Sequence, residues 1–120
     1  MATILLADDD AAVRDLVKRA LTSEGHRVHV TQDGLEALDY LNAGNGDIDI
    51  LISDVDMPQL DGISLAEKAL ALKPGLAVIL MSGFSDQLER AARLRVRQLL
   101  SISKPFTLDQ IKQVVRTVLA

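Results

Sequence analysis

Short apolar runs alternate along this chain with longer stretches whose apolar residues recur at helical spacing. These runs are too brief for helices. Together with residues 27–31, where Val28 and Val30 alternate with polar residues, they predict five β-strands, over residues 3–7, 27–31, 48–53, 77–81 and 98–102. The central runs are almost continuously apolar, which is typical of strands that are buried on both faces. Strands that alternate with helices form a parallel sheet with helices on both sides. The sequence therefore predicts a doubly wound α/β fold with five strands and five helices.

The helices are predicted from stripes of apolar residues. The first stripe follows Asp10, an expected N-cap, and Gly25 is expected to end that helix. A weaker, arginine-rich helix is expected over residues 86–94. The other stripes consist of Leu35, Leu38 and Leu41, then Ile63, Ala66, Ala69 and Leu70, and finally Leu108, Ile111, Val114, Val115, Val118 and Leu119.

Composition narrows the class of protein. The length of 120 residues fits one domain over residues 1–120, and the final helix is expected to leave no room for an output domain. Seventeen acidic residues against 13 basic ones argue against binding to nucleic acid through bulk charge. The absence of cysteine excludes disulfides and thiolate chemistry. No apolar run approaches the ~20 residues of a membrane span, and the N-terminus lacks a signal-peptide pattern, so a cytoplasmic protein is expected.

Chemically reactive groups follow four of the predicted strands. Asp8 and Asp9 follow the first strand and Asp54 the third, while Ser82 follows the fourth and Lys104 the fifth. In an open α/β sheet, ligands bind outside the carboxyl ends of the strands. If the first strand is central, these groups share one cleft. Each acid taken singly is more often a cap or loop residue, but the complete set favours a functional site.

Clustered carboxylates repel one another, and a divalent cation relieves that repulsion. Oxygen ligands in a partly hydrated site suit Mg²⁺. Asp54 could then attack an incoming phosphoryl group and form an aspartyl phosphate. Mg²⁺ and Lys104 would neutralise the phosphoryl oxygens, and Ser82 would donate a hydrogen bond to one of them.

At these residues the sequence closely resembles the receiver domain of bacterial two-component response regulators, from Ile4 to Leu119. The resemblance rests on the Asp8-Asp9 pair, the loop D-V-D-M-P-Q-L-D-G that starts at Asp54, the hydroxyl of Ser82, and the K-P-F sequence that starts at Lys104. It implies a flavodoxin-like (CheY-like) sheet in the strand order 2-1-3-4-5.

The resemblance also implies roles. Asp54 is the phosphoacceptor, which receives phosphate from a histidine kinase or a His phosphotransfer protein. Asp9 and Asp54 are direct Mg²⁺ ligands, and Asp8 acts on the ion largely through water. The backbone carbonyl of Asp56 is the remaining ligand that the protein supplies. Such a module speeds its own phosphorylation and hydrolysis but is not an enzyme with a separate substrate.

One position departs from the family. Receiver domains usually carry an aromatic residue three positions before the conserved lysine, and here that position is Ser101. Either the signal travels through Ser82 and the adjacent loop alone, or the output surface responds differently. The missing aromatic and the Ser82-Gly83-Phe84 sequence also resemble CpdR-type regulators. That resemblance implies an adaptor for an ATP-dependent protease, active in its unphosphorylated form.

Two other functions remain open at this point. A small phosphatase could use Asp54 and Asp56 as nucleophile and acid, and a phosphate-independent interaction module could carry a vestigial site. His26 and His29 lie in one segment without further ligands nearby, which argues against a metal role. A basic run is either a solvated face or a docking patch, and it consists of Arg90, Arg93, Arg95 and Arg97.

Overall fold

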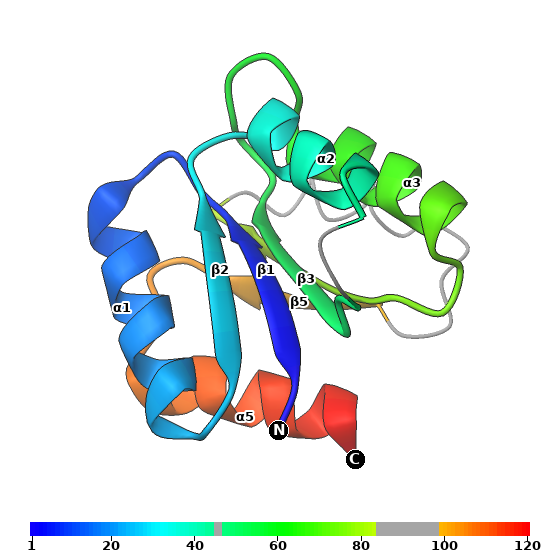
Figure 1. Cartoon of the computed structure of the whole chain (residues 1–120). Coiled ribbons are helices and arrows are strands. Elements are labelled where there is room, and N and C mark those ends of the chain that lie inside the picture. Colours follow the sequence, from blue (N-terminus) through cyan, green and yellow to red (C-terminus); the bar gives the residue numbers. More distant parts are fainter. Residues whose placement is uncertain (45–46, 84–98) are drawn as a thin grey trace.

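The computed structural model describes residues 1–44, 47–83 and 99–120 of the chain (Figure 1). The described elements, in chain order, are β1 (Thr3–Ala7), α1 (Ala11–Ser23), β2 (Arg27–Thr31), α2 (Gly34–Asn42), β3 (Ile50–Asp54), α3 (Gly62–Leu72), β4 (Ala77–Ser82), β5 (Leu99–Ser103) and α5 (Leu108–Leu119). The five predicted strands are confirmed. The helix expected over residues 86–94, the arginine run and Phe84 lie outside the described residues.

The five strands form one parallel sheet in the order β2-β1-β3-β4-β5, which confirms the predicted topology. At the carboxyl edge of the sheet, Ala7 pairs with Ser53, and Asp54 pairs with Met81. On the other side of β4, Ser82 pairs with Ser103. This register brings the carboxyl ends of β1, β3, β4 and β5 next to one another.

Helices cover both faces of the sheet, with α1 and α5 on one side and α2 and α3 on the other (Figure 1). Successive residues of a strand point to opposite faces, so β1, β3 and β4 each contribute buried residues to two cores. On the first face, Ile4 and Leu6 of β1 pack with Val17 of α1 and Val115 of α5. On the second face, Leu5 of β1 belongs to the core that α2 and α3 cover. The central strands β1, β3 and β4 are therefore buried on both sides, as their apolar sequences predict.

Each described helix begins at a side chain that caps its free N–H groups. Asp10 accepts a hydrogen bond from the Ala12 N–H, which confirms its predicted role. Asp33, Asp61 and Thr107 cap α2, α3 and α5 in the same way. Gly25, with a φ of 86°, follows α1 where the chain must take the left-handed conformation that glycine adopts readily.

The apolar stripe predicted for α2 is only partly correct. Leu35 is 42% exposed, whereas Ala37 is fully buried. The reason is a close approach of α2 to the loop before α3, because a Cβ atom on Gly34 would lie 2.3 Å from the carbonyl oxygen of Leu60. The small residues Gly34 and Ala37 therefore face the neighbour, and Leu35 is turned outward.

The predicted bounds of the first two strands are confirmed, whereas those of the last three differ from the structure by one or two residues. The third strand was expected over residues 48–53 and is found at Ile50–Asp54. Ile48 is buried but precedes the strand, and the side chain of Asp49 accepts a hydrogen bond from the Thr3 N–H of β1. Among the described helices, none combines the length and the apolar character that a bilayer crossing requires.

Candidate functional site

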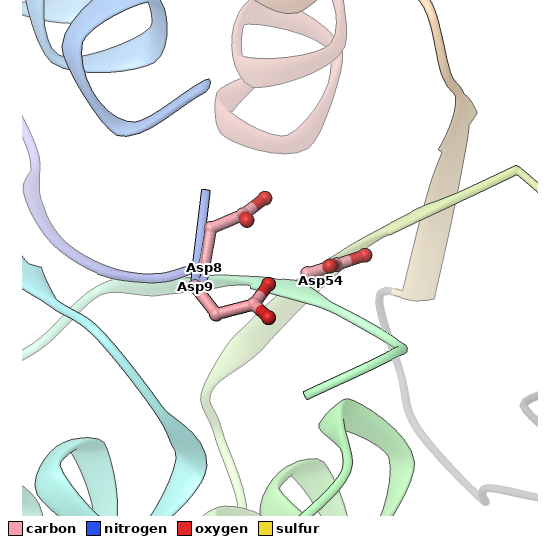
Figure 2. A group of neighbouring side chains, drawn as sticks. All are labelled: Asp8, Asp9 and Asp54. Atoms are coloured by element: carbon pink, nitrogen blue, oxygen red, sulfur yellow. The ribbon is translucent and has the colours of Figure 1, made fainter. Parts of the chain in front are cut away.

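Three carboxylates converge at the carboxyl edge of the sheet (Figure 2). Asp8 and Asp9 follow β1, and Asp54 is the last residue of β3. One oxygen from each of the three lies within 4.8 Å of the others. Two strands that are far apart in the sequence thus build one acidic pocket, as the sequence predicts.

The three acids differ in exposure. Asp8 has no solvent-accessible surface, Asp54 is 6% exposed, and Asp9 is exposed. Burial, and next the negative charge of Asp8, raise the pKa of Asp54 to about 6, although Lys104 opposes the shift. Ionisation of Asp54 therefore costs free energy in the folded protein, and a cation bound among the three acids would reduce that cost.

Lys104 follows β5, and its ammonium lies beside two of the three acids. Its Nζ lies 2.9 Å from Oδ2 of Asp8 and 3.3 Å from Oδ2 of Asp54. Burial alone lowers the pKa of the Lys104 ammonium, but the hydrogen bond to Asp8 and the charges of Asp8 and Asp54 raise it overall. Lys104 is therefore held protonated between two carboxylates.

Every polar atom of Asp8, which lies in the turn between β1 and α1, forms a hydrogen bond. The Asp8 N–H donates to the Thr31 carbonyl of β2, at 3.3 Å, and Oδ1 accepts from the Asp10 N–H, at 2.8 Å. The carbonyl of Asp8 accepts from Nη1 of Arg14, at 2.8 Å. Arg14 could not be singled out beforehand, because nothing in the sequence distinguishes it from the other basic residues of α1.

Ser82 ends β4 beside the pocket and is 1% exposed. It follows Met81, the β4 partner of Asp54, and its carbonyl accepts a hydrogen bond of 3.0 Å from the Lys104 N–H. The ends of β4 and β5 are therefore fixed to each other. The role of the Ser82 hydroxyl toward a phosphoryl group stays a prediction.

Asp56 lies on the loop after β3, with its side chain exposed. Within the described part of the chain, its carboxylate is not a member of the three-carboxylate group. The predicted use of its backbone carbonyl as a metal ligand stays a prediction. The end of the same loop is tightly packed, because a Cβ atom on Gly62 would lie 2.1 Å from the carbonyl oxygen of Asp54. Asp61 caps α3 at the same point.

The two histidines have structural partners away from this pocket. His26 accepts a hydrogen bond at Nδ1 from the Ala2 N–H, at 3.0 Å. His29 stacks on Tyr40 with a ring-centroid distance of 3.8 Å. Neither belongs to the metal-ligating group found among the described residues.

The donor set of the pocket fits Mg²⁺. All three side chains offer carboxylate oxygens, and Mg²⁺ prefers one or two carboxylates together with water and phosphate. One of the three, Asp9, is open to solvent, so a hydrated ion can enter. The repulsion that raises the pKa of Asp54 is the property that a bound cation would relieve.

Comparison with known families agrees with this geometry. The model of the family described as the response regulator receiver domain matches residues 4–116. The chain is 35% identical over 118 residues to the sensor kinase CckA of Brucella abortus (strain 2308), and 34% identical over 116 residues to the response regulator MprA of Mycobacterium sp. (strain KMS). The matched segments cover 98% and 97% of this chain, but only 12% and 50% of those relatives.

Solved structures share the fold. A response regulator receiver protein from Sinorhizobium medicae WSM419 is 32% identical, with a TM-score of 0.87 over 98% of this chain and 94% of that one. The chemotaxis response regulator CheY4 of Vibrio cholerae has a TM-score of 0.86 over 98% of both chains. At 23% identity, the second likeness concerns the fold alone, and it confirms the predicted CheY-like architecture.

Proposed function

Because this chain belongs to the response regulator receiver domain family, we propose that it accepts a phosphoryl group on Asp54 and thereby changes a protein-binding surface. The observation that carries the proposal is the position of the Asp54 carboxylate. It is nearly buried, lies 3.3 Å from the Lys104 ammonium, and shares its pocket with Asp8 and Asp9.

The chemistry is a nucleophilic displacement at phosphorus. One oxygen of Asp54 forms a bond to the phosphorus of a phosphohistidine in the donor protein, and the bond from phosphorus to the imidazole nitrogen breaks. The bonding electron pair stays on that nitrogen, and because the other ring nitrogen of the phosphohistidine carries a proton, the donor is left with a neutral imidazole. Asp54 becomes an acyl phosphate, and attack of water on its phosphorus later restores the carboxylate and releases inorganic phosphate.

The surrounding residues stabilise the charge that develops on the phosphoryl oxygens. Lys104 supplies a fixed ammonium, and Ser82 supplies a hydroxyl donor at the end of the next strand. Asp8, Asp9, Asp54 and the backbone carbonyl of Asp56 would hold Mg²⁺, which neutralises negative charge when it is bound. Burial of Asp54 limits the access of water and favours a product that persists long enough to act as a signal.

Histidine kinases or His phosphotransfer proteins are the proposed donors, as the match to the receiver segment of a sensor kinase supports. For the target we propose a protein, with an ATP-dependent protease as the specific candidate. That candidate is supported by the resemblance to CpdR-type regulators and by Ser101, which is exposed on β5 where an aromatic residue is usual. The cytoplasmic location expected above stays a prediction.

The test is phosphoryl incorporation from a small phosphodonor in the presence of Mg²⁺, measured by intact mass. Wild-type protein should gain one phosphoryl group, and Asp54→Asn should gain none. Asp39→Asn changes the same kind of side chain on the exposed surface of α2 and should behave as wild type. Incorporation by Asp54→Asn at the wild-type level would refute the proposal, and sustained turnover of a phosphomonoester would support the phosphatase instead.

A further inference from the structure

We propose that Arg14 is a positioning residue for the acidic pocket and strengthens Mg²⁺ binding through its hydrogen bond to the backbone of Asp8. Arg14 is the fourth residue of α1, and its side chain extends back toward β1. Nη1 of Arg14 lies 2.8 Å from the Asp8 carbonyl oxygen. The inference rests on the proposed function, since it concerns the same pocket.

Asp8 is the residue on which the turn between β1 and α1 is built. Its N–H is held by Thr31 of β2, Oδ1 by the Asp10 N–H, and Oδ2 by Lys104 after β5. The carbonyl is the remaining polar atom of Asp8, and Arg14 occupies it. With all these bonds in place, Asp8 is held by one strand edge, one helix and the lysine of the pocket.

The position of Asp9 depends on these hydrogen bonds of Asp8. The Asp9 side chain is exposed, and among the described residues no hydrogen bond holds it. The main chain between Asp8 and Asp10 therefore sets the point and direction from which the Asp9 side chain extends. The Asp8 carbonyl belongs to the peptide unit that joins Asp8 to Asp9, so the bond from Arg14 acts directly on the plane that orients Asp9.

A hydrogen bond from a charged donor is stronger than one between neutral groups, which suits Arg14 to this task. The side chain is partly buried, so the bond is less exposed to competing water than a surface contact. Loss of the bond removes this contact to the carbonyl of the Asp8–Asp9 peptide and leaves the orientation of that peptide less restricted. Part of the free energy of Mg²⁺ binding is then needed to order it.

Charge alone predicts the opposite effect on metal affinity. A guanidinium near the pocket repels Mg²⁺, so removal of its charge should strengthen binding if Arg14 acted only as a nearby cation. Removal should weaken binding if Arg14 acts by orienting the peptide. The direction of the change therefore separates the two roles.

The experiment is a calorimetric titration with MgCl₂ at constant ionic strength, on wild type, Arg14→Met and Arg19→Met. Arg19 is exposed, lies on the same helix and is about 7.5 Å further along its axis, so its variant matches the change in charge. We expect Arg14→Met to raise the dissociation constant about threefold to tenfold, and Arg19→Met to leave it within twofold. Faster amide exchange at Asp9 and Asp10 in Arg14→Met, without Mg²⁺, is the second expected result.

An unchanged or lower dissociation constant in Arg14→Met would overturn the inference and leave the proposed function intact. Absence of Mg²⁺ binding by wild type would instead contradict the proposed function. If Arg14→Met does not fold, Arg14→Lys keeps the charge but shortens the reach. That variant should bind Mg²⁺ at least twofold more weakly than wild type, and equal binding would also overturn the inference.

Discussion

At the scale of single residues, Asp54 combines burial with negative neighbours, and both disfavour its ionised form. Its pKa is raised from 3.8 to about 6, with burial as the largest cause and Asp8 as the next. The folded protein therefore keeps a proton on Asp54 at pH values where the unfolded chain has released it. Since the folded state binds the proton more tightly, the free energy of unfolding falls as pH rises from about 4 to about 6.

Replacement of Asp54 by asparagine should remove this penalty. Without metal at pH 7.5, we expect Asp54→Asn to raise the free energy of unfolding, by at most about 3 kcal/mol. Near pH 4 the gain should fall to a small fraction of that value, because Asp54 is then almost fully protonated in the folded protein and partly protonated in the unfolded chain. The measurement is denaturant unfolding in EDTA at both pH values.

Asp39→Asn serves as the control for this measurement, since Asp39 is exposed on α2 and should show little change at either pH. The raised pKa of Lys104 affects stability only at alkaline pH, where that ammonium loses its proton. Lys104 therefore does not contribute to a difference in stability between the two pH values compared. A loss of stability in Asp54→Asn at pH 7.5, or an equal gain at both pH values, would contradict the interpretation.

At the scale of elements, the junction between β3 and α3 is closely packed at Gly62. The Gly62 N–H donates to the Val55 carbonyl, and Gly62 lies against the Asp54 carbonyl. The D-G sequence at Asp61 and Gly62 thus has two physical reasons. Asp61 caps α3, and Gly62 leaves room for the backbone of the residue proposed to accept phosphate.

Gly62→Ala should therefore move the end of β3. We expect the variant to lose about 1–3 kcal/mol of stability, although alanine is the better helix former, and to incorporate phosphoryl groups more slowly. Gly75→Ala is the matched control, because a Cβ atom there meets nothing within 4 Å. Thermal unfolding and initial labelling rates give the comparison, and equal behaviour of the two variants would refute the argument from packing.

The order and type of the described elements could be predicted because β2 alternates polar with apolar residues, the other strands are short and mostly apolar, and each helix carries an apolar stripe. The sequence predicted less well which residues of α2 are buried. Leu35 fits the stripe but is exposed, since the contact of Gly34 with Leu60 comes from a distant loop. Strand ends were also displaced, as at Ile50–Asp54, because pairing with neighbours sets where a strand begins.

The members of the acidic pocket could be predicted because parallel strands present their carboxyl ends at one edge. Asp8, Asp9, Asp54 and Lys104 do lie together there. The contribution of Arg14 could not be predicted, since a hydrogen bond to a backbone carbonyl leaves no mark in the sequence. The contact between Gly34 and Leu60 is hidden for the same reason, as it depends on tertiary packing.

At the scale of the whole molecule, the site exists only where the strand order β2-β1-β3-β4-β5 places distant segments side by side. Asp8 and Lys104 are 96 positions apart in the chain, yet they form a direct hydrogen bond. No single strand or helix supplies all the residues of the site, so the proposed function requires the complete fold. This agrees with the family match, which spans residues 4–116.

The central claim is that this convergence makes one aspartate, Asp54, the acceptor of a phosphoryl group. The most direct measurement is to identify the labelled residue after treatment with a small phosphodonor. The acyl phosphate is reduced with borohydride, and the modified residue is located by peptide mass spectrometry. We predict modification at Asp54 alone, and only when Mg²⁺ is present. Modification at Asp9, Asp56 or a histidine instead, or equal labelling of Asp54 in EDTA, would contradict the claim.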